Sequence, residues 1–162
     1  MTEKEMLLNT WDREYQLTTK VFKAYPEGKL DFKPHELSRT AKELAWTVVW
    51  EEGIFVNAAV TGEFDFSHIE PPPATMKGIL NAYEKKHAEN IRKVKDLSDA
   101  DVNKKIKMMV APNTFTDVRG IDAIWGGIMD NIHHRGQFSV YLRMAGGKVP
   151  SIYGPSHDEP WN

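Results

Sequence analysis

Four long segments of the chain repeat their apolar residues in steps of three and four. This spacing places the apolar side chains on one face of an α-helix. The segments are residues 3–25, 40–59, 76–97 and 118–145. Four helices of about 20 residues, each roughly 30 Å long, bury their apolar faces most economically by packing side by side. The sequence therefore predicts an all-α fold, a four-helix bundle made by a single domain that spans residues 1–162.

Capping signals mark the ends of these segments. Thr40 and Glu43 have the spacing of a capping box, in which each side chain accepts a hydrogen bond from the amide of the other residue. Gly146 and Gly147 follow the last segment, and glycine often ends a helix because it adopts left-handed backbone angles without strain. A further capping sequence at Ser98 predicts a short helix of one or two turns after the third long one.

Two connections between the predicted helices are long. Residues 62–75 contain three consecutive prolines, which exclude a helix interior there. Residues 105–115 show some alternation of apolar and polar side chains, which predicts an extended connection, with a short strand as the alternative. We therefore expect long crossover connections in both places. We expect residues 147–161 to form an irregular tail that lies over the bundle.

The composition excludes several classes of function. The net charge is −2 and the lysines and arginines are scattered, whereas nucleic-acid binding requires a concentrated basic surface. The chain has no cysteine, which excludes a thiolate nucleophile and fits a reducing cytoplasm. The N-terminal residues lack the pattern of a signal peptide, and no segment approaches the ~20 apolar residues of a membrane span. We expect a cytoplasmic protein that binds neither nucleic acid nor membrane.

The last segment carries the densest group of potentially catalytic or metal-binding side chains. Asp130 and His134 are four residues apart, so on a helix they lie on the same face. A carboxylate and an imidazole in this arrangement can bind one divalent metal ion. Alternatively, Asp130 fixes the tautomer of His134 through a hydrogen bond. His133 is predicted to be exposed or at an interface, whereas Arg135 and Gln137 are predicted to hold the helix to its neighbours or to the tail.

The second segment contains another polar pair. Thr47 and Glu51 are also four residues apart, within a stripe that is otherwise apolar. A buried carboxylate at position 51 would need a charge partner or a metal ion. Alternatively, Glu51 and Glu52 both lie on the solvent edge of the helix. His87 in the third segment is predicted to be a partly buried packing residue rather than a ligand.

Four longer motifs stand out in the sequence: PHELSRTAKELAW, TGEFDF, HHRGQFSVYLRMAGGKVP and SIYGP. In these motifs the chain resembles the DinB/YfiT-like family of four-helix-bundle proteins. The resemblance covers nearly the whole chain, and HRGQ-x3-YLR is its most specific part. It implies a bundle with up-up-down-down helix order, often present as a homodimer, and a nickel or zinc ion held by three histidines. One of these histidines comes from helix two, and the other two lie four residues apart on helix four.

In this chain, the three ligand positions implied by the resemblance are Thr47, Asp130 and His134. Only His134 is a histidine, and the hydroxyl of Thr47 is a weak ligand for a divalent transition metal. Glu51, one helical turn beyond Thr47, offers one way to complete the site, with two carboxylates and one imidazole. In the other arrangement, Asp130 accepts a hydrogen bond from His134 or Thr47, and the bundle keeps a polar pocket without a metal ion.

Two functions are compatible with the altered site. In the first, the protein has no assigned activity and binds metal weakly or not at all. Its pocket, which can receive a small molecule, is then walled by Trp46, Trp50 and Trp125. In the second, the protein is a divalent-metal-dependent hydrolase, or a thiol-dependent transferase like related family members. It would then use His134 and Asp130, with Glu51, as ligands.

Overall fold

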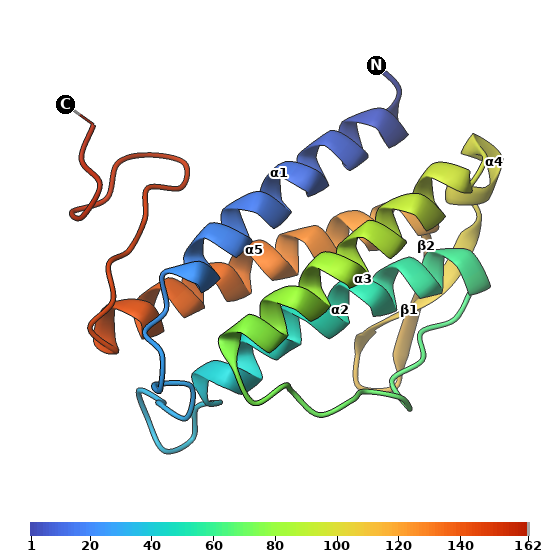
Figure 1. Ribbon diagram of the computed structural model, residues 1–162. Coiled ribbons are helices and arrows are strands. Elements are labelled where there is room, and N and C mark those ends of the chain that lie inside the picture. The colour runs from blue at the N-terminus through green and yellow to red at the C-terminus, as the bar shows by residue number, and fades with distance from the viewer. Residues whose placement is uncertain (162) are drawn as a thin grey trace.

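Four long helices account for most of the chain (Figure 1). The computed structural model describes residues 1–161. The long helices are α1 (Glu3–Lys23), α2 (Ala41–Thr61), α3 (Met76–Asp96) and α5 (Gly120–Met144). Their boundaries lie within two residues of those that the sequence predicts. Within the described part of the chain, no helix is long and apolar enough to cross a lipid bilayer.

The predicted capping interactions are present. The hydroxyl of Thr40 accepts a hydrogen bond from the amide of Glu43, and the carboxylate of Glu43 accepts one from the amide of Thr40. A capping box at Ser98 starts the short helix α4 (Asp99–Val102). The last long helix begins at Gly120, slightly later than expected, because the two residues before it belong to a strand.

The long helices pack in a closed ring of contacts, in which α1 and α2 each touch both α3 and α5. Arg119, just before α5, pairs with Glu3 at the start of α1, so α1 and α5 run in the same direction. Lys4 at the start of α1 donates a hydrogen bond to the carbonyl of Leu97 after the end of α3, so these two helices are antiparallel. Because α2 runs alongside α3 in the same direction (Figure 1), the helix order is up-down-down-up. The up-up-down-down order implied by the family resemblance is wrong.

The connections explain this order. Residues 62–75 run back along the length of the molecule from the end of α2 to the start of α3 (Figure 1), as the crossover prediction requires. The second predicted crossover is wrong. The end of α3 and the start of α5 lie at the same end of the molecule, so residues 97–119 only need to turn the chain around.

A β-hairpin in this second connection corrects the all-α prediction: the chain is mostly helical, and the short strand that the sequence left open as an alternative is present within a pair of strands. It consists of β1 (Lys105–Ala111) and β2 (Thr114–Arg119), which pair antiparallel with Met109 opposite Phe115. Asn113 in the turn has a φ of 58°, in the left-handed region that asparagine tolerates better than most residues. Most side chains of the hairpin are exposed, so no buried face imposes the regular alternation by which a strand is recognised in a sequence.

Two large apolar clusters fill most of the core, one toward each end of the long helices, and a small third cluster lies under the hairpin. The first includes Phe22, Tyr83 and Phe138, and the second includes Leu7 and Ile124. In every long helix, buried polar residues separate the parts that enter the two clusters. These are Glu14 and Thr18 in α1, Glu51 and Glu52 in α2, His87 and Asn90 in α3, and Asn131 and Arg135 in α5. Polar groups are costly to bury without partners, so apolar packing alone does not explain this layer.

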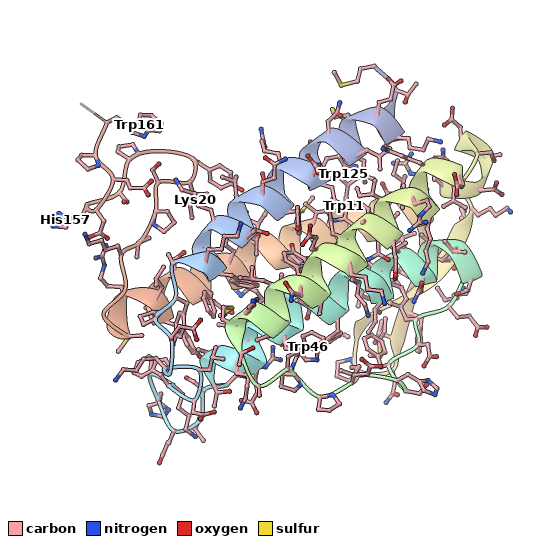
Figure 2. The ribbon with its side chains drawn as sticks, in the orientation of Figure 1. Trp11, Lys20, Trp46, Trp125, His157 and Trp161 are labelled. Carbon is pink, nitrogen blue, oxygen red and sulfur yellow. The ribbon has the colours of Figure 1, made fainter. Side chains whose placement is uncertain are left out.

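The C-terminal tail is irregular, as predicted, and lies beside α1 (Figure 1). Lys20 of α1, labelled in Figure 2, forms an ion pair with Glu159 of the tail. Deeper in the molecule, the buried guanidinium of Arg135 pairs with Glu14 at 2.8 Å and donates to the hydroxyl of Tyr153 in the tail. Arg135 therefore joins α5 to α1 and to the tail, which confirms the role predicted for it.

Candidate metal centre

The packing of α2 against α5 brings three potential metal ligands together. Ligand atoms of Glu51, Asp130 and His134 all lie within 4.8 Å of one another. Nε2 of His134 is 3.5 Å from Oε2 of Glu51 and 3.7 Å from Oδ1 of Asp130. The structure thus adds Glu51 to the Asp130–His134 pair, which is one of the two arrangements that the sequence leaves open.

A glycine sets the separation of the two helices beside this cluster. Gly127 of α5 lies against the ring of Phe55, and a Cβ atom at position 127 would be 2.7 Å from that ring. Real side chains do not come so close, so only glycine allows α2 and α5 to approach in this way. Phe55 is one helical turn beyond Glu51 and Gly127 is almost one turn before Asp130. The contact therefore fixes the distance across which the ligands face each other.

The candidate centre has a closed side and an open side. Glu51 is 9% exposed, whereas the side chain of Asp130 is 45% exposed. The alternative that Glu51 and Glu52 both lie on the solvent edge is wrong, because both residues are buried. Among the described residues, the buried Oε2 of Glu51 has no hydrogen-bond partner. That atom is aimed at His134 but is too far from Nε2 for a good hydrogen bond.

Neighbouring groups control the orientation and charge of His134. Its Nδ1 lies 2.8 Å from Oε1 of Gln137, so Nδ1–H donates to the amide oxygen and Nε2 faces the two carboxylates. The contact with Glu51 raises the pKa of His134 above its ordinary value against the opposing effect of burial, and Gln137 and Asp130 raise it further. A metal ion would replace the proton at Nε2, the usual ligand atom of a histidine whose Nδ1–H is held by an oxygen.

Thr47 lies near this cluster but its hydroxyl is already engaged. It donates to the carbonyl of Glu43 at 3.0 Å and accepts from a guanidinium nitrogen of Arg39 at 2.9 Å. The side chain on α2 that joins the two ligands of α5 is therefore Glu51, one turn further along the helix. Arg39 lies in the loop before α2, inside the motif PHELSRTAKELAW, but nothing in that motif distinguishes it as a site residue, so sequence reasoning missed it.

The three tryptophans predicted to wall a pocket lie in two different places. Trp46 and Trp50 line a surface depression together with Arg39 and Thr47. The indole of Trp46 donates to the carbonyl of a residue just before the three prolines, at 2.6 Å. Trp125 packs instead against the second apolar cluster, which contains Trp11, and Figure 2 shows both residues well away from Trp46.

Behind the candidate centre, a buried hydrogen bond between Glu52 and His87 continues the polar layer. Oε1 of Glu52 lies 2.7 Å from Nδ1 of His87, and burial raises the pKa of Glu52 despite this contact. The His87 ring also stacks on Tyr15, with centroids 4.0 Å apart. The packing role predicted for His87 is confirmed. Its partner Glu52 was missed because α2 is buried on nearly all sides, so the apolar pattern does not show which face a carboxylate occupies.

The three residues fit a divalent cation. Ligands ~2.1 Å from a tetrahedral ion lie roughly 3.4 Å from one another. The separations of 3.5 Å and 3.7 Å from Nε2 of His134 are close to that value. A cation would give the unpartnered oxygen of Glu51 a partner, and the exposed side at Asp130 leaves room for a substrate or water. Two carboxylates and one imidazole form a plausible ligand set for several divalent metals.

Two sequence comparisons agree with this description. The sequence model of the DinB family matches residues 1–161. YrdA of Bacillus subtilis strain 168, described only as an uncharacterized protein, is 26% identical over 156 residues. That alignment covers 94% of this chain and 89% of YrdA. The relative therefore supports membership of a family without supplying an activity.

Two solved structures have the same fold. A DinB-like protein from Bacillus cereus gives a TM-score of 0.74 at 25% identity, with 92% of this chain and 97% of that protein covered. The DinB-like protein YjoA from Bacillus subtilis gives 0.73 at 17% identity, with 91% and 96% covered. The family match extends over the whole described chain, including the HRGQ-x3-YLR motif, which contains the ligand His134 and its hydrogen-bond partner Gln137. The chain belongs to the DinB family.

Proposed function

We propose that the protein binds a divalent metal ion through Glu51, Asp130 and His134. The observation that carries this proposal is the buried Oε2 of Glu51, which has no hydrogen-bond partner among the described residues and lies 3.5 Å from Nε2 of His134. A buried polar atom without a partner costs ~1–3 kcal/mol, and more when it is charged. A cation between the carboxylates and the imidazole would remove that cost.

The ligand set also indicates which metals the centre would prefer. Three imidazoles suit nickel and zinc, whereas carboxylates are harder ligands that suit manganese and magnesium. With Glu51 and Asp130 in place of two imidazoles, we expect zinc or manganese to bind better than nickel. Because Asp130 is half-exposed, the ion would remain accessible from solvent.

The proposed reaction class is hydrolysis or transfer to a thiol. A divalent ion at this position would act as a Lewis acid on a substrate. Gln137 would hold the ring of His134 in place through its contact with Nδ1. Arg39, whose guanidinium is fixed by Thr47 beside the depression that Trp46 lines, is positioned to bind an acidic group of a substrate.

A metal-free pocket protein is the second candidate, and one specific observation favours it. His134 has a raised pKa, so in its protonated form it would offset part of the negative charge of Glu51 and Asp130 without any ion. In that case the DinB fold would serve as a binding scaffold for a small molecule.

Thermal unfolding in the presence of metals separates the two candidates. Protein stripped with a chelator should be melted with increasing zinc, manganese or nickel. An ion present at a hundred times its Kd would stabilise the native state by ~2.7 kcal/mol. We expect His134→Ala to remove this stabilisation. His133→Ala, the matched control at the exposed neighbouring histidine, should retain it. Equal stabilisation of wild type and His134→Ala, or none in wild type, would favour the metal-free candidate.

We also infer that the protein is a cytoplasmic homodimer. The outer face of α5 supports self-association, because Met129, Val140 and Met144 are each more than half exposed along it. The absence of cysteine from the sequence supports a reducing compartment.

A further inference from the structure

An apolar depression lies between the β-hairpin and the segment that follows α2. Six apolar side chains line this aromatic groove: Phe55, Phe64, Phe66, Met108, Met109 and Phe115. Its volume is about 570 Å³, within the ~300–1,000 Å³ of small-molecule sites. The groove is distinct from the three residues of the candidate metal centre.

Three phenylalanine rings form one wall of the aromatic groove. Phe55 and Phe64 meet edge to face, with centroids 5.5 Å apart and an interplanar angle of 88°. Phe64 and Phe66 are nearly parallel, with centroids 6.2 Å apart. Phe55 and Phe64 are anchored on a small buried cluster, whereas Phe66 is 52% exposed. A further aromatic ring can meet this wall in the offset or edge-to-face geometries that such rings prefer.

The hairpin supplies the opposite wall. Met109 and Phe115 face each other across the two strands and are 54% and 61% exposed. Methionine adapts its shape to a bound group and its sulfur makes favourable contacts with aromatic rings. Burial of these side chains by a ligand would remove apolar surface from water, which is the main favourable term in such binding.

The charges around the groove select the class of ligand. Lys107 at the rim is held by Asp117 at 2.6 Å, so its charge is already compensated. The other ionisable lining residue is Glu63, which would repel an anion. We propose that the aromatic groove binds a compact, uncharged aromatic molecule of one or two rings. A protein partner fits less well, because a stable interface needs roughly 800 Å² from each side and the exposed apolar groups here surround a small hollow.

The groove and the candidate metal centre both take a side chain from α2. Phe55 lies one helical turn beyond Glu51, so both side chains lie on the same face of α2. An aromatic group held in the groove would be the apolar part of a substrate whose reacting part reaches the ion. This last step rests on the proposed function, whereas ligand binding in the groove requires no metal.

Methionine-methyl NMR tests the groove within a single sample. The protein should be labelled with ¹³C on its methionine methyl groups and titrated with indole, an uncharged aromatic probe. We expect saturable shifts of Met108 and Met109. Met1 and Met6, which are exposed at the start of the chain, are internal controls and should not shift. Equal shifts of all exposed methionines, or shifts that do not saturate, would show adventitious binding only and overturn the proposal.

Substitutions locate the binding and separate it from the metal centre. Phe66→Ser and Phe115→Ser should each weaken indole binding at least tenfold, whereas Val140→Ser, at an exposed apolar residue of α5, should not. Unchanged affinity in both phenylalanine variants would overturn the assignment. The titration should give the same affinity in His134→Ala, so loss of metal binding and loss of groove binding are measured independently. A change of molecular mass that depends on Phe115 would identify the groove as a protein interface and would also overturn the proposal.

Discussion

At the scale of single residues, the site depends on where Glu51 points. The spacing of Asp130 and His134 predicts that they lie on one face of the helix, because residues i and i+4 of a regular helix lie on the same side. The direction of Glu51 could not be predicted in the same way. Helix α2 is buried on nearly all sides, so an apolar stripe does not distinguish the face of Glu51 from that of Glu52. Only the packing of α2 against α5 and α3 decides that Glu51 meets His134 of α5 while Glu52 meets His87 of α3.

The contact between Glu51 and His134 predicts a pH effect in the metal-free protein. Glu51 raises the folded-state pKa of His134, so the resulting stabilisation is fully present below the unfolded pKa of about 6.5 and is lost as pH rises through the folded pKa. Urea unfolding from pH 5.5 to 8.5 should show this loss in wild type, and Glu51→Gln should reduce it. NMR titration should give a lower pKa for His134 in the variant. An unchanged pKa would contradict the contact.

At the scale of secondary-structure elements, short sequence signals predict the helices, whereas the hairpin and the helix directions depend on tertiary packing. The capping box at Thr40 acts within a few residues, so it marks a helix end in any fold. The hairpin could not be assigned with the same security, because side chains such as Met109 and Phe115 are exposed and no buried face imposes alternation. The direction of each helix depends on which helix ends lie together, as Lys4 of α1 and Leu97 after α3 do. The periodicity of the apolar residues carries no information about these contacts.

The buried link between α1 and α5 predicts a large effect on stability. Arg135→Met removes the buried charge partner of Glu14 and leaves only the exposed Arg13 paired with it, which should lower the free energy of unfolding by about 3 kcal/mol. The double variant Glu14→Leu/Arg135→Met should lose less than Arg135→Met alone, because no unpaired charge remains. Urea unfolding measures both. Arg143→Met, which breaks an ion pair between a half-exposed arginine and Asp158, is the matched control and should change stability much less.

Equal losses in Arg135→Met and Arg143→Met would contradict the structural role of the buried link. A double variant that is less stable than Arg135→Met alone would show that the contacts of Glu14 with Arg13 and Tyr153 outweigh the cost of its buried charge. Arg135 also donates a hydrogen bond to Tyr153 in the tail, and Tyr153 donates one to Glu14. Tyr153→Phe should therefore lower the free energy of unfolding by less than Arg135→Met does.

At the scale of the whole molecule, apolar and polar side chains are distributed unevenly in both the core and the surface. The two apolar clusters are separated by a polar layer to which all four long helices contribute. Such a layer weakens apolar packing and is retained where polar groups are needed, which is why the candidate metal centre lies beside it. On the outside, α3 presents many charged side chains, whereas the outer face of α5 presents Met129, Gly136, Val140 and Met144.

The outer face of α5 predicts how two copies associate. Val140→Glu would place a charge in the centre of that apolar face, so a homodimer formed there should dissociate. Light scattering after size-exclusion chromatography should give twice the chain mass for wild type and the monomer mass for the variant. Val60→Glu, at an exposed valine of α2, should leave the dimer intact. A wild-type monomer, or a dimer broken equally by both substitutions, would contradict association through α5.

The bound-metal content of the purified protein tests the central claim most directly. Untagged wild type, His134→Ala and His133→Ala should be purified from rich medium, and metals should be measured by mass spectrometry against protein concentration. The structure predicts close to one zinc or manganese ion per chain in wild type and in His133→Ala, and almost none in His134→Ala. A wild-type protein without stoichiometric metal that also fails to take up zinc or manganese on addition would contradict a metal centre at Glu51, Asp130 and His134.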